Sequence, residues 1–281
     1  MLLFFLLAMA GFGATSPENA VITEPVANMY SRPTREADVV SQAIFSTNVS
    51  ILEKQPGWLH VRTPDDYTGW IASDAALVRP PYAVAGRVAH TENLFASVYR
   101  ETDITKHAPV ITVPFETRFE VASGPIGPDD RWLEVRMPDS RSAWVQSGDI
   151  SFDASPRSVA ETIEFGRRFL GLPYLWGGTS TFGYDCSGYV QMLCRRRGVL
   201  IPRDADLQAA WSGVRPIELD RLEPGDLLYF GSRPDHITHT GMYIGGGQFI
   251  NATTHLHPVV QICALDDPHW KHLLVAARRL K

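Results

Sequence analysis

A tryptophan-containing pattern occurs twice in the first half of the chain, about 75 residues apart. Residues 57–65 read GWLHVRTPD and residues 131–139 read RWLEVRMPD; a second tryptophan follows each, in GWI at 69–71 and AWV at 143–145. Both copies alternate apolar and polar residues before a Pro-Asp turn, which is typical of short β-strands with one buried face. The chain is therefore expected to be multi-domain, beginning with two all-β barrels of one design, at residues 20–80 and 84–152.

The remaining part of the chain, residues 156–281, has a different pattern. An amphipathic segment that begins near Ser155 or Ser158 and ends near Leu170 indicates a helix. Strand-like runs come later, and Gly245-Gly246-Gly247 joins two of them as a tight hairpin. Helices followed by antiparallel strands predict an α+β domain.

A second helix is predicted to begin at Cys186. Asp185 is a natural N-cap, and apolar residues follow Cys186 at helical spacing. A thiol in the first turn lies at the positive end of the helix dipole, which favours the thiolate. We therefore expect Cys186 to be a nucleophile, and Cys194 and Cys263 to be core residues.

A nucleophilic cysteine needs a base and a group that orients the base. Of the nine histidines, His239 is expected to open one strand of the glycine hairpin, and Asn251 to end the other. Because an antiparallel hairpin brings its two ends together, these residues are predicted to be neighbours. The result is a Cys-His-Asn arrangement, with the Cys186 backbone N–H and the Tyr174 hydroxyl as candidate oxyanion donors.

Composition excludes several other classes of function. The chain has 281 residues, a net charge of −5 and a pI near 6.0, so no electrostatic argument favours nucleic acid or an anionic membrane. Its three cysteines lack metal-like spacing, and the histidine pairs 236/239 and 255/257 lack further ligands. We expect no metal, no cofactor and no disulfide framework.

The first 14 residues, MLLFFLLAMAGFGA, form an apolar run that ends in small residues. This run resembles a secretory signal peptide and is too short to span a membrane. We expect a periplasmic or secreted protein with no integral membrane segment once the signal is removed. The alternative is a buried N-terminal segment of a cytoplasmic protein.

Five short motifs together resemble the NlpC family of papain-like cysteine peptidases. In order, they are GLPYLWGG at 171–178, FGYDCSG at 182–188, IPRDA at 201–205, LEPGDL at 222–227 and HTGMYIG at 239–245. The two repeats resemble bacterial SH3-like domains. The whole chain is thus similar to the γ-D-glutamyl-L-diamino acid peptidases (dipeptidyl-peptidase VI type) of bacterial cell-wall turnover.

The resemblance implies roles for individual residues. Cys186 would be the nucleophile, His239 the base and Asn251 the third polar residue, a position where many relatives have histidine. Tyr174 and Trp176 would line the substrate cleft.

The resemblance also implies a site for the free amine of an N-terminal L-Ala. Asp185 and Ser187 would bind this amine. The first SH3-like domain would add Tyr67 and an acid, with Glu36 the first choice and Asp38 the second.

The expected substrates are peptidoglycan stem peptides with the sequence L-Ala-γ-D-Glu-diamino acid, cleaved by a monomeric enzyme. An endopeptidase that acts on intact cell wall, with the SH3-like domains as murein binders, is one alternative. An acyltransferase on the same fold is another. A non-enzymatic cell-wall-binding protein is the alternative from a different class.

Overall fold

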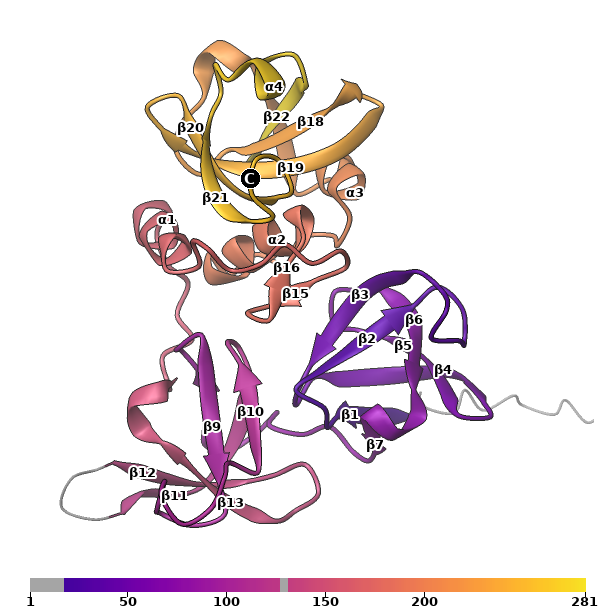
Figure 1. The fold of residues 1–281 in the computed structure, drawn as a ribbon, viewed down its shortest axis with the longest axis vertical. Coiled ribbons are helices and arrows are strands. Elements are labelled where there is room, and N and C mark those ends of the chain that lie inside the picture. The colour runs from indigo at the N-terminus through magenta and orange to yellow at the C-terminus, as the bar shows by residue number, and fades with distance from the viewer. Residues whose placement is uncertain (1–17, 127–130) are drawn as a thin grey trace, which may run out of the picture.

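The computed structural model describes residues 18–126 and 131–281, and the predicted signal peptide lies outside them. Two β-units and one α+β unit follow one another along the chain (Figure 1). No helix among the described residues has the length and apolar character needed to cross a membrane.

The first β-unit contains seven strands and one short 3-10 helix. The sheet order is β3-β2-β6-β5-β4-β1-β7, and all pairs are antiparallel. The elements are β1 (Asn19–Ile22), β2 (Val26–Tyr30), β3 (Val39–Ile44), β4 (Asn48–Gln55), β5 (Trp58–Arg62), β6 (Thr68–Ala72), η1 (Ser73–Ala75) and β7 (Ala76–Val78).

The second β-unit repeats this arrangement strand for strand. Its order, β10-β9-β13-β12-β11-β8-β14, is that of the first sheet with every strand number raised by seven. The elements are β8 (Val88–Thr91), β9 (Phe95–Tyr99), β10 (Ile111–Pro114), β11 (Arg118–Ile126), β12 (Trp132–Arg136), β13 (Ser142–Gln146), η2 (Ser147–Asp149) and β14 (Ile150–Ser151). The expected repeat is present, but within the described residues the two sheets are open rather than closed barrels.

The first tryptophan of each copy packs in an equivalent way. Trp58 meets Tyr30 edge-on with ring centroids 5.6 Å apart, and Trp132 meets Tyr99 edge-on at 5.5 Å. Such perpendicular ring pairs stabilise a packed core beyond the area that they bury. This shared packing explains why the tryptophan occurs at the same place in both copies of the repeat.

The C-terminal part is α+β, as expected. Its main sheet is antiparallel, in the order β17-β22-β18-β19-β20-β21. The elements are α1 (Val159–Arg167), β15 (Thr179–Ser180), β16 (Gly183–Tyr184), α2 (Cys186–Arg196), α3 (Ala205–Ala210), β17 (Val214–Ile217), η3 (Leu219–Arg221), β18 (Leu227–Arg233), β19 (His236–Gly245), β20 (Gln248–Thr253), β21 (Val259–Ala264), α4 (Pro268–Lys271) and β22 (Leu274–Leu280).

Capping side chains determine where the two main helices begin. Ser158 forms a capping box with Glu161 at the start of α1. The Asp185 carboxylate accepts from the Gly188 backbone N–H at 2.7 Å and caps α2. Gly198, after the last turn of α2, has φ +75°, a conformation that favours glycine at a helix end.

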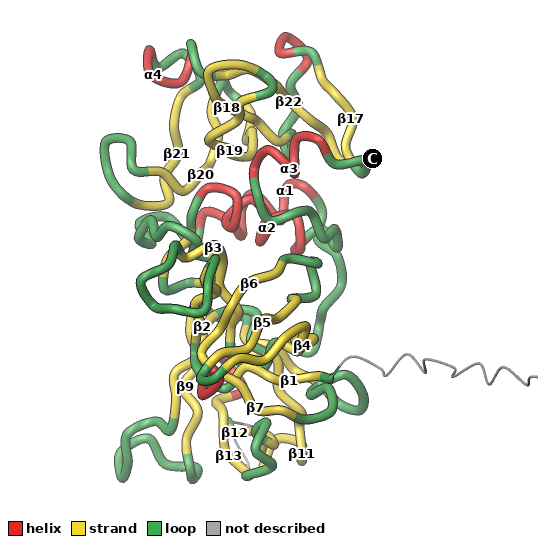
Figure 2. Tube along the Cα trace, turned by 90° about the vertical axis from the view of Figure 1, so that its right-hand side faces the viewer, coloured by secondary structure: helices red, strands yellow, loops and turns green. Residues whose placement is uncertain are grey.

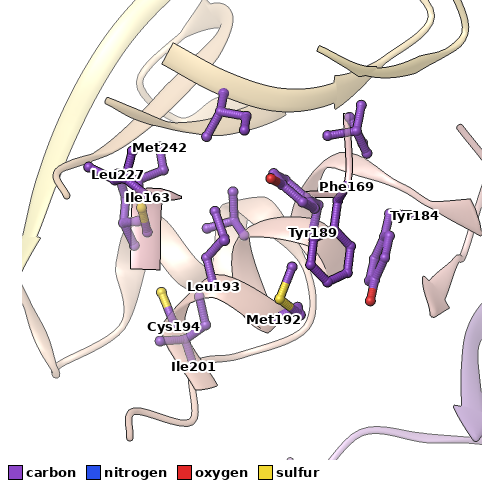
Figure 3. Packing of buried hydrophobic residues seen from close by; sticks show 14 of the residues in the cluster. Ile163, Phe169, Tyr184, Tyr189, Met192, Leu193, Cys194, Ile201, Leu227 and Met242 are labelled. Carbon is purple, nitrogen blue, oxygen red and sulfur yellow. The ribbon is translucent and has the colours of Figure 1, made fainter. Parts of the chain in front are cut away.

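The largest core lies between α2 and the sheet. Figure 3 shows Tyr189, Leu193 and Cys194 of α2 gathered with Leu227 of β18 and Met242 of β19. All five side chains are fully buried. Cys194 is thus a core residue, as expected, and the apolar stripe of α2 fixes the helix against the sheet.

Both β-units lie on the side of the α+β unit where α2 is found (Figures 1 and 2), and both accept hydrogen bonds from α2. Arg195 donates to Glu116 of the second unit, with a shortest distance of 2.6 Å. Arg196 similarly pairs with Glu92 at 2.9 Å. The first unit approaches the start of α2, where Cys186 lies.

We expect Leu193→Ala to destabilise the α+β unit by about 3 kcal/mol, because it leaves a cavity in a core with no exposed surface. Leu219→Ala, at a position that is 46% exposed, is the matched control and should cost far less. Differential scanning calorimetry of the full chain measures both variants. Equal effects would contradict the assigned core.

Candidate active site

Cys186 begins α2 and is only 8% exposed, yet it lines a cavity of about 720 Å³. The cavity lies between the first β-unit and the α+β unit. Six of its lining residues are Asp38, Tyr67, Trp176, Cys186, Asp204 and Ile237. A pocket of this size at a junction between units is a usual place for a small-molecule or peptide substrate.

His239 and Asn251 are in contact, as their hairpin pattern predicts. His239 Nε2 lies 2.9 Å from Asn251 Oδ1. His239 is the fourth residue of β19 rather than its first, because β19 extends back to His236. Cys186 lines one cavity with Ile237 and Thr238, the two residues that precede His239 in β19.

Two aromatic rings pack against the imidazole. His239 stacks on Trp270 with ring centroids 4.8 Å apart and an interplanar angle of 27°. Phe230 packs against it at 5.6 Å. Sequence analysis did not identify Trp270, because no local pattern links α4 to β19.

Burial determines the protonation states here, and it opposes the expected thiolate. Burial, followed by the charge of Asp185, raises the pKa of the Cys186 thiol to about 12. Burial lowers the pKa of His239 to about 4, although its hydrogen bond to Asn251 acts in the other direction. The ligand-free site therefore favours a neutral thiol and a neutral imidazole, a correction to the helix-dipole prediction.

Arg203 is fully buried beside Asp185 and Ser187. Its Nη2 donates to Asp185 Oδ2 at 2.6 Å, and its Nη1 donates to Asp185 Oδ1 at 3.0 Å and to Ser187 Oγ at 2.8 Å. Its Nε donates to Ser41 Oγ of β3 in the first β-unit, at 3.0 Å. Both predicted amine ligands are thus engaged by an arginine to which sequence analysis gave no role.

Asp204 is the acid that the structure places beside Tyr67. The Tyr67 hydroxyl donates to Asp204 Oδ2 at 3.1 Å, and burial raises the pKa of the Asp204 carboxyl. Asp38 also lines the cavity, whereas Glu36 is exposed and does not. Asp204 belongs to the IPRDA motif, and this motif is the sequence feature that could have identified it as a site residue.

The two predicted cleft residues occupy opposite environments. Tyr174 is partly buried near Cys186, and burial raises the pKa of its hydroxyl, which keeps it a hydrogen-bond donor at any physiological pH. Trp176 is 70% exposed at the cavity rim. The next residue, Gly177, has φ +74°, and a Cβ there would lie 2.8 Å from the Val39 side chain of the first β-unit.

Within residues 18–126 and 131–281, no cluster of three or more histidine, cysteine, aspartate or glutamate side chains has an arrangement that could hold a metal ion. The three cysteines are free thiols. The chemistry that these residues support is attack by a thiol assisted by an imidazole.

Comparison with known families identifies the region around Cys186. Residues 171–279 match the NlpC/P60 family. This part of the chain is an NlpC/P60 domain. Residues 29–75, in the first β-unit, match the bacterial dipeptidyl-peptidase SH3 domain. The N-terminal region therefore contains an SH3-like domain ahead of the NlpC/P60 domain, the domain of the cysteine peptidases that the motifs resemble.

Two curated relatives resemble the chain over most of its length. The γ-D-glutamyl-L-lysine dipeptidyl-peptidase of Bacillus cereus is 29% identical over 260 residues, which cover 85% of this chain and 74% of the relative. Dipeptidyl-peptidase 6 of Lysinibacillus sphaericus is 27% identical, covering 89% and 93%. The solved structure of an NlpC/P60 family protein from Bacillus cereus shares the fold, with a TM-score of 0.80 at 24% identity, covering 93% of this chain and 99% of that protein.

We expect the His239 imidazole to stay neutral until the pH falls to about 4, because its partly buried ring is harder to protonate than an ordinary histidine, whose pKa is near 6.5. NMR titration of histidine-labelled, ligand-free protein measures the midpoint. A midpoint above 6.5 would indicate a thiolate–imidazolium pair and contradict the neutral resting state.

Proposed function

We propose that this protein is a cysteine peptidase that hydrolyses the γ-D-Glu–diamino acid bond of peptidoglycan stem peptides with a free N-terminal L-Ala. One observation carries the substrate proposal. The Cys186 cavity contains the carboxylates of Asp204 and Asp38 beside the Tyr67 hydroxyl, and so offers an ammonium group an acidic end to bind. The named activity of the B. cereus relative supports the same bond.

The proposed chemistry begins with the neutral pair. The Cys186 sulfur attacks the γ-carbonyl carbon of D-Glu while the thiol proton passes to His239. The Cys186 backbone N–H, which is free of an intrahelical partner at the start of α2, and the Tyr174 hydroxyl donate to the developing oxyanion.

Collapse of this tetrahedral intermediate breaks the carbon–nitrogen bond and leaves a thioester on Cys186. His239 returns the proton to the departing amine of the diamino acid. Water then hydrolyses the thioester with the same imidazole as base. Asn251 orients the ring through both steps, and no cofactor is required.

We propose that Arg203 and Asp204 have different roles at the acidic end of the cavity. Because Arg203 already neutralises Asp185, the charge available to an incoming ammonium comes mainly from Asp204 and Asp38. A substrate whose amino group is amide-linked to glycan would bury these carboxylates without a cation, which is costly. This favours released peptides over intact wall, and hence recycling or late degradation.

We further propose four segments along the chain: a signal peptide at 1–14, SH3-like domains at 20–80 and 84–152, and the peptidase domain at 156–281. The shared strand order supports an SH3-like second unit. The substrate class supports a periplasmic or secreted location. The proposed active species is a monomer, because one chain supplies every group named above.

We expect L-Ala-γ-D-Glu-L-Lys to be cleaved at the γ-amide bond, and Cys186→Ala to abolish cleavage. Acetylation of the alanine amine should lower kcat/KM by about 100-fold or more, since the carboxylates lose their cation. Mass spectrometry of the products measures both, with purified sacculi as a competing substrate. Preference for sacculi, or indifference to acetylation, would favour the endopeptidase alternative.

We expect Asp204→Asn to lower kcat/KM for the free-amine peptide by about 100-fold while leaving the slow reaction of the acetylated peptide nearly unchanged. Asp38→Asn should have a smaller effect, and Glu36→Gln smaller still. Asp74→Asn, at an exposed site in η1, is the control. A larger loss from Glu36→Gln than from Asp204→Asn would restore the sequence-based choice of acid.

A further inference from the structure

The side-chain amide of Asn251 is held from both sides in a fully buried position. Its Oδ1 faces His239 Nε2 at 2.9 Å. Its Nδ2 donates to the Gln261 carbonyl oxygen at 3.3 Å and to Cys263 Sγ at 3.5 Å. A 180° flip of the amide would lose both N–H bonds and would place Oδ1 against the Gln261 carbonyl oxygen, two acceptors with no proton between them.

The orientation of this amide determines which nitrogen of His239 can act as a base. A neutral imidazole carries one N–H and one lone pair. Because Oδ1 only accepts hydrogen bonds, the ring proton must be on Nε2, and the lone pair is then on Nδ1. A flipped amide would donate to Nε2, and the ring proton would then be on Nδ1. In that tautomer Nδ1 has no lone pair and cannot act as a base.

Cys263 is buried in β21 on the same side of the sheet as the Asn251 side chain. It packs in a small cluster with Phe230, Phe249 and Trp270, and the first and last of these also contact the His239 ring. Burial raises the pKa of its thiol, so the sulfur is neutral at neutral pH. Neutral sulfur is a weak acceptor, suited to an amide N–H.

We propose that Cys263 is a positioning residue, whose sulfur, together with the Gln261 carbonyl oxygen, holds the Asn251 amide in the orientation that keeps the His239 proton on Nε2. The predicted tautomer of His239 depends on this geometry alone. The kinetic consequence rests on the proposed function.

The deciding experiment is NMR of ¹⁵N-histidine-labelled protein, which distinguishes the two neutral tautomers of His239. Wild-type protein should show the Nε2–H form alone. Cys263→Val, which stays apolar but removes the acceptor, should show a mixture, and Cys263→Ser should restore the single form. Cys194→Val removes a buried thiol of α2 that is not one of the two acceptors of the Asn251 amide, and should leave the tautomer unchanged.

Kinetics on L-Ala-γ-D-Glu-L-Lys then test the consequence for catalysis. We expect Cys263→Val to lower kcat about fivefold, the effect of one neutral hydrogen bond, with KM little changed. Cys263→Ala replaces it if the valine variant does not fold. If wild-type protein fails to cleave the peptide, the proposed function is lost, while the tautomer measurement still decides this inference. A single Nε2–H form in Cys263→Val overturns it, whatever the rate.

Discussion

The site depends most on the ion pair and hydrogen bonds that the buried Arg203 guanidinium forms. Its four hydrogen bonds reach Asp185 at the start of α2, Ser187 two residues later, and Ser41 in the first β-unit. Breaking a buried ion pair by removing one partner costs about 3–5 kcal/mol, because an unpaired charge remains in a low-dielectric interior. The pairing therefore links the helix that carries Cys186 to the unit that closes the cavity.

Two influences compete at Cys186, and their magnitudes decide the outcome. The helix N-terminus favours a thiolate by about 0.3–1 kcal/mol at an exposed site and up to about 2 kcal/mol in partly buried geometries. Each pKa unit corresponds to about 1.4 kcal/mol, so burial that moves the thiol from 9.0 to about 12 outweighs the dipole. The thiol and imidazole that we propose to react are thus both uncharged in the ligand-free protein.

Local patterns predicted much of this structure. The Asp185 cap, the Ser158 cap, the glycine hairpin and the His239–Asn251 contact each depend on residues close in sequence or on strand pairing, and each is present. The repeat predicted two equivalent sheets but not their open edges, because closure depends on hydrogen bonds between distant strands.

Contacts between units escaped prediction for a related reason. Arg203, Asp204 and Trp270 acquire their partners from segments far away in sequence, and no periodicity reports such a meeting. Glu36 and Asp38 lie two residues apart in one loop, and sequence alone could not tell which faces the cavity. The backbone conformation of the folded loop determines that Asp38, and not Glu36, lines the cavity.

The turn that carries Tyr67 in the first β-unit corresponds to the turn that carries Arg141 in the second, and the two turns have different surroundings. In each β-unit the turn closes with the same backbone bond, from Thr63 to Tyr67 in the first and from Met137 to Arg141 in the second, at 2.9 and 2.8 Å. Arg141 pairs with the neighbouring Asp139 in solvent, while Tyr67 reaches across to Asp204. One turn geometry thus lies at the surface in one copy and lines the Cys186 cavity in the other, so the position of each unit against the α+β unit determines what its turn contacts.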